Sequence, residues 1–71
     1  MDNKEKVEAL WNRLEQYKAT AEQHMFPVLL MLDMKLVPAY NDLKKNWNEE
    51  HADIFIRSME NIVFKKLGIE L

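Results

Sequence analysis

The sequence M-F-P-V-L-L-M-L-D-M-K-L-V, from Met25 to Val37, is the most apolar stretch of this 71-residue chain. Eleven of its thirteen residues are apolar when Pro27 is counted, and only Asp33 and Lys35 carry charge. Leucine and methionine favour helices, and the sequence offers no second candidate strand with which this stretch could pair. We therefore predict a helix from Pro27 to Val37, with the proline in its first turn.

On a helical wheel this predicted helix has no continuous polar face. A helix that is apolar all round must be surrounded by protein or by lipid. A chain of 71 residues contains too few elements to surround it. The pattern therefore predicts that the protein self-associates, most simply as a twofold dimer.

The segments on either side have the periodicity of amphipathic helices. From Asn3 to about His24, apolar residues recur at alternating steps of three and four, and Asp2 is placed to cap the helix. A second helix is expected from about Glu49 to Leu67, capped by Asn46 or Asn48. Gly68 is then expected in the left-handed conformation that ends many helices, with Ile69 folded back on Phe64.

A segment from Pro38 to about Trp47 lies between the apolar stretch and the last predicted helix. Its connection to the apolar stretch stays open. Pro38 removes a backbone donor, so it either kinks a continuing helix or starts a new one that ends near Trp47. Either way, the sequence predicts an all-α domain over residues 1–71. It comprises three main helices and a short fourth helical segment, completed by dimerisation.

Composition narrows the ways in which so small a chain can be stabilised. There is no cysteine for a disulfide, and two histidines without thiolates make no zinc site. We therefore expect neither metal nor cofactor, and regard a partner chain as the stabilising element. The net charge of −2, the mixed N-terminus and the shortness of the apolar stretch predict a cytoplasmic protein without a transmembrane segment.

Asp33 admits two interpretations because it interrupts the most apolar face of the chain. It either marks the solvent edge of the bundle or is partly buried against Arg13, a lysine or Tyr40, within the same chain or in a second subunit. The predicted protein-binding or dimer interface consists of Phe26, Leu29, Leu30, Leu32, Asp33, Met34, Leu36 and Val37.

The titratable residues do not form a recognisable catalytic pattern. Glu49, Glu50, His51 and Asp53 are close in sequence, but successive helical residues point in different directions. We therefore expect a small protein-binding protein, such as an adaptor, an inhibitor or an accessory subunit, and not an enzyme. The alternative is a dimeric nucleic-acid-binding regulator, and a third class is an amphipathic protein of membrane surfaces.

Overall fold

The computed structural model describes residues 2–66 and 68, without the side chains of Ile62, Phe64 and Lys66. Three α-helices account for most of this part: α1 (Asn3–Thr20), α2 (Phe26–Lys45) and α3 (Glu49–Ser58). A short 3-10 helix, η1 (Gln23–Met25), precedes α2, and a π-helical segment, η2 (Met59–Lys66), continues α3. The predicted all-α class is confirmed.

Side-chain caps fix the beginnings of the first and last helices. The Asp2 carboxylate accepts a hydrogen bond of 2.8 Å from the Glu5 backbone amide. The Asn48 side chain accepts one of 3.1 Å from the His51 backbone amide. Each bond satisfies a backbone donor that has no partner within the helix. Of the two asparagines that could cap α3, the structure thus uses Asn48.

α2 is a single helix that runs through Pro38. The segment after Pro38 is therefore the second half of α2, which settles the alternative that the sequence left open. A proline inside a helix deprives the carbonyl four residues earlier, here that of Met34, of its hydrogen-bond partner. Both residues are exposed, so this carbonyl lies on the solvent side of α2, where water can satisfy it.

The prediction that the first helix extends to His24 was wrong. α1 ends at Thr20, and Ala21 and Glu22 adopt extended backbone conformations before η1 begins. These two residues turn the chain so that α2 can run back along the other helices. No proline or glycine marks this break, so the helical periodicity of the sequence continues across it.

The last helix also differs from the expected uniform α-helix, because Met59–Lys66 is wound as a π-helix. Gly68 has a φ of +66°, which confirms the left-handed conformation expected after the helix. Leu67, Ile69 and the Phe64 side chain lie outside the described part of the structure, and the expected contact between Ile69 and Phe64 lies there too.

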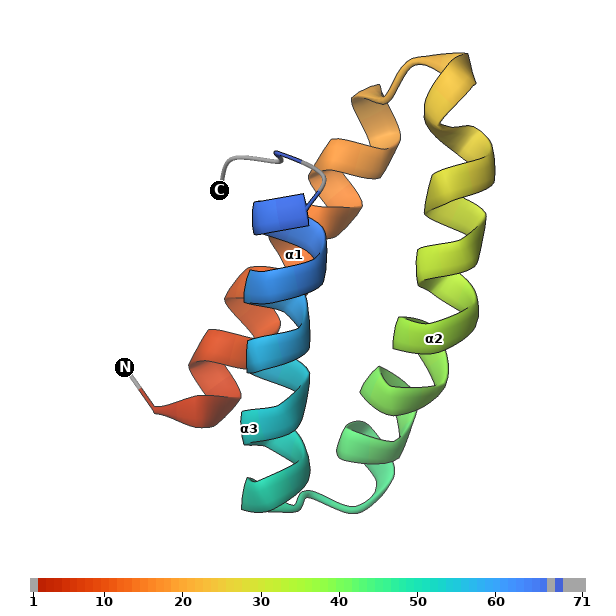
Figure 1. Ribbon diagram of the computed structural model, residues 1–71. Coiled ribbons are helices and arrows are strands. Elements are labelled where there is room, and N and C mark those ends of the chain that lie inside the picture. The colour runs from red at the N-terminus through yellow and green to blue at the C-terminus, as the bar shows by residue number, and fades with distance from the viewer. Residues whose placement is uncertain (1, 67, 69–71) are drawn as a thin grey trace.

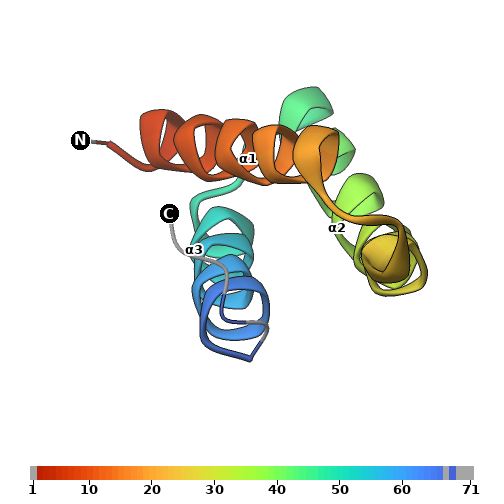
Figure 2. The ribbon, with the colours of Figure 1, turned by 90° about the horizontal axis from the view of Figure 1, so that it is seen from above.

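α1 lies across one side of the pair formed by α2 and α3. Figure 1 shows α2 and α3 running in opposite directions along the molecule, and Figure 2 shows α1 crossing α3 at a steep angle and connecting to the beginning of α2. The core lies where the three meet, and every helix contributes to it. Its buried apolar residues are Val7, Leu10 and Leu14 of α1, Leu29, Leu32, Leu36, Tyr40 and Leu43 of α2, Ala52, Phe55 and Ile56 of α3, and Met59 and Val63 of η2.

An aromatic cluster joins all three helices at the middle of this core. The rings of Trp11 and Tyr40 are stacked with centroids 4.2 Å apart, and Phe55 packs against both at about 6 Å. Stacked aromatic pairs of this kind contribute about 1 kcal/mol beyond the area that they bury. The Tyr40 hydroxyl donates to both carboxylate oxygens of Glu8, at 2.8 and 3.0 Å. Tyr40 therefore anchors α2 to α1 by an apolar contact and a polar one.

The environment of Tyr40 predicts a loss of stability at high pH. Burial, together with the hydrogen bond to Glu8 and its charge, raises the pKa of Tyr40 from 10 to about 12. Between these two values the folded protein keeps a proton that the unfolded chain loses. This contribution to the free energy of unfolding is complete below pH 10 and is lost as the pH rises toward 12.

Two measurements test this expectation. Tyrosinate absorbance should show a step near pH 12 that is absent in Tyr40→Phe. Urea titrations should show that the wild type loses stability between pH 10 and 12 more steeply than the variant. If the step near pH 12 persisted in Tyr40→Phe, the assignment to Tyr40 would be incorrect.

Candidate protein-binding surface

The side chains of α2 divide between an inner side and an outer side. Leu29, Leu32 and Leu36, three of the residues predicted for a protein interface, lie in the core and pack within the chain itself. Their spacing of three and four residues places them on one side of the helix. The structure thus gives these leucines a role in the fold of the single chain.

The outer side of α2 carries four large apolar side chains that are more than half exposed. Phe26, Leu30, Met31 and Met34 retain exposures of 53%, 63%, 66% and 72%. We call these four residues the α2 apolar face. Three of them belong to the predicted interface, and the structure brings them together on one side of about two turns of helix. Single exposed apolar residues are ordinary, but four neighbouring ones form a surface suited to contact with another molecule.

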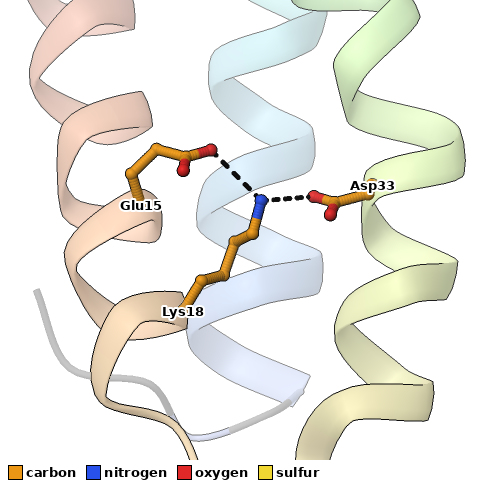
Figure 3. A network of polar contacts seen from close by, with 3 residues as sticks. All are labelled: Glu15, Lys18 and Asp33. Carbon is orange, nitrogen blue, oxygen red and sulfur yellow. Dashed lines mark hydrogen bonds and ion pairs between the residues drawn. The ribbon is translucent and has the colours of Figure 1, made fainter.

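Asp33 lies between these two sides of α2 and pairs with Lys18 of α1. The two side chains are 2.8 Å apart, and Lys18 also contacts Glu15 at 3.1 Å, so one ammonium group bridges two carboxylates (Figure 3). The Asp33 side chain keeps 30% of its exposure. Of the two interpretations that the sequence left open, the geometry supports the partly buried pair with a lysine, formed within one chain. Val37, the remaining predicted interface residue, is half-buried.

The Lys18 ammonium is stabilised as a cation by this arrangement. Partial burial lowers the pKa of Lys18, but the hydrogen bonds and charges of Asp33 and Glu15 outweigh burial and raise it above 10.5. Lys18 is therefore charged at neutral pH. Because a raised pKa favours the protonated folded state, this contribution to stability is present below pH 10.5 and is lost as the pH rises above it.

Sequence reasoning missed a second exposed feature, a groove between α2 and α3. The groove has a volume of about 260 Å³, and no residue of α1 lines it. Leu36, Leu43 and Phe55 contribute to its lining together with Ile54, which is 60% exposed. Ile54 directly precedes Phe55 and Ile56 in the sequence, and its apolar side chain is the one sequence signal for the groove.

The acidic residues at the beginning of α3 act as hydrogen-bond acceptors for α1 and the preceding loop. The Asn3 amide donates to Glu49 and Asp53, each at 2.9 Å, and the Trp47 indole donates to Glu49 at 2.8 Å. These contacts attach the N-terminal end of α1 to α3. Within residues 2–66 and 68, no three carboxylate or imidazole groups are placed to hold a metal ion.

Neither protein-family models, nor curated proteins, nor solved structures provide a match to this chain. In the part of the chain that the structure describes, no helix has both the length and the apolar character needed to cross a membrane.

The Lys18–Asp33 pair predicts a moderate loss of stability for Asp33→Asn. The substitution removes the charge that neutralises Lys18, but both groups keep contact with water. We expect the free energy of unfolding to fall by about 1 kcal/mol, the upper end for exposed ion pairs. Urea denaturation at neutral pH measures this change.

Glu15→Gln is the matched control, because Glu15 is the more exposed partner of the same lysine. It should cost only about 0.3 kcal/mol, as is typical of a pair three residues apart on a helix. Equal losses in the two variants would contradict the assignment of Asp33 as the principal partner of Lys18.

Proposed function

We propose that this protein acts by binding another protein through the α2 apolar face. The observation that carries the proposal is the exposure of Phe26, Leu30, Met31 and Met34 side by side on one helix. Burying apolar surface is the main driving force of protein association, and contiguous exposed apolar patches mark such sites. The protein would then be an adaptor, an inhibitor or an accessory subunit rather than an enzyme.

The composition of this face supports a helical segment as the bound partner. Phe26, Leu30 and Met34 follow one another at steps of four residues, which creates a ridge along α2. The side chains of a second helix can pack on both sides of such a ridge. Methionine is flexible and polarisable, so Met31 and Met34 can adapt to partner side chains of different shapes.

The interior of the protein supports binding without a large rearrangement. The core beneath the α2 apolar face is closed by the inner leucines of the same helix, and α2 is attached to α1 by Tyr40 and Asp33. The ridge is therefore presented on a helix whose position is already fixed. A preorganised surface of this kind loses little conformational entropy on binding.

Affinity capture from the source cell tests the proposal. The bait is the immobilised protein, and the variant is the double substitution Leu30→Ser with Met34→Ser. Because both side chains are exposed, the variant should fold normally, as surface substitutions usually change stability by at most about 0.5 kcal/mol. We expect at least one protein to be captured by the wild type, displaced by untagged wild type, and absent from the variant.

The matched control changes two exposed polar residues of α1 by Asn12→Ser and Gln16→Ser. It should capture the same protein as the wild type does. Equal capture of every displaceable protein by the Leu30/Met34 variant would refute the α2 apolar face as the binding site.

A further inference from the structure

The groove between α2 and α3 carries two opposite charges at its rim that have no partner within the described chain. Lys35 and Asp42, both from α2, line it and are exposed. The ion pairs of the described residues involve other side chains: Lys6 with Glu60, Lys18 with Glu15 and Asp33, and His24 with Glu22. The two rim charges are therefore available to a molecule that covers the groove.

The spacing of these two charges is the decisive feature. Seven residues are about two turns of α-helix, so Lys35 and Asp42 lie on the same side of α2, about 10 Å apart along its axis. Their order along the chain is basic and then acidic. A helix lying antiparallel to α2 would satisfy both charges only if it offered an acid opposite Lys35 and a base opposite Asp42. α2 itself is such a helix.

We propose that the groove is the interface of a twofold dimer in which α2 packs antiparallel to α2 of a second copy. With the twofold axis between residues 38 and 39, Lys35 of each protomer faces Asp42 of the other. A twofold interface must be complementary to itself, and this reciprocal pair meets that requirement. The arrangement places two ion pairs symmetrically about the axis.

The residues around this axis suit close contact between two helices. Ala39 lines the groove and has a short side chain, so the two α2 backbones can approach one another near the centre of the interface. Ile54 of α3 lies at the same groove and loses its exposure when the second copy covers it. The rim charges thus determine the register, and the apolar residues between them supply the surface that is buried.

The dimer would leave the ridge of Phe26, Leu30 and Met34 free. At about 100° per residue, Leu30 and Met34 lie about 140° and 100° around α2 from Lys35, whereas Met31 lies only about 40° away and would be at the dimer interface. The dimer would present this ridge twice, once on each protomer. The inference therefore does not depend on the proposed function, and the two can fail separately.

Only parts of two helices per protomer take part, so the interface is at the small end of known protein interfaces, below about 1,200 Å² in total. We therefore expect a weak dimer, with micromolar affinity. Exposed ion pairs are screened within about 8 Å at physiological ionic strength, so added salt should weaken the dimer further.

Charge reversal tests the register by sedimentation equilibrium. The single variants Lys35→Asp and Asp42→Lys should each raise the dimer dissociation constant at least tenfold, because each places like charges opposite one another twice. The double variant Lys35→Asp with Asp42→Lys restores opposite charges in reversed order, and its dissociation constant should return to within about threefold of the wild type. Arg13→Asp changes the charge of an exposed α1 residue and should have no effect.

The proposal would be overturned if the wild type stayed monomeric at concentrations up to about 1 mM. A dissociation constant of about 1 mM is taken as the limit of weak specific binding. Unchanged affinity in both single variants, or a double variant weaker than either one, would overturn it too. Circular dichroism verifies that each variant is folded.

Disulfide formation between the two copies of α2 tests the register of the dimer without changing any charge. The chain has no cysteine of its own, so an introduced cysteine has a single possible partner. Pro38→Cys should form a disulfide-linked dimer on mild oxidation. Met34→Cys should not, because its two copies would lie about 13 Å apart along the helix axes, beyond the reach of about 7 Å between α-carbons. Equal cross-linking of the two variants would contradict the proposed axis.

Discussion

α2 carries apolar side chains on two of its sides, and α1 and α3 can cover only one of them. The inner side, with Leu29, Leu32 and Leu36, builds a core with α1, α3 and η2. The outer side, with Leu30 and Met34, remains in contact with water. Exposed apolar surface of this extent does not stabilise the single chain, so its presence is best explained by contact with another molecule.

The position of α1 determines which surfaces stay open. The Trp11–Tyr40 stack and the Lys18–Asp33 pair attach α1 to one side of α2, and the Asn3 contacts attach it to α3. The opposite side of the α2–α3 pair is left with its groove. The chain therefore offers two distinct surfaces, an apolar ridge and a groove with charges at its rim. We propose the first as the surface for a protein partner and the second as the surface for another copy of the chain.

Local features of the sequence were sufficient to predict much of the fold. The cap at Asp2, the buried positions of α1 and the turn at Gly68 each follow from a few neighbouring residues, and the sequence narrowed the cap of α3 to Asn46 or Asn48. The division of the apolar stretch into an inner and an outer side could not be predicted, since it depends on where α1 and α3 pack. The partner of Asp33 was equally inaccessible, because Lys18 is fifteen residues away and on another helix. The exposure of Ile54 could not be predicted for the same reason.

Oxidation of methionines by dilute hydrogen peroxide, followed by mass spectrometry of peptides, tests the division of α2 most directly. Met34 is 72% exposed and Met59 is fully buried. Their oxidation rates therefore compare the accessibility of the outer side of α2 with that of the core in one sample. The account predicts that Met34 is oxidised at least about tenfold faster than Met59 in dilute protein, as the burial of a reactive group limits its oxidation to transient opening. Equal, slow oxidation of both residues would show that the outer side of α2 is covered within the chain, and would contradict the account.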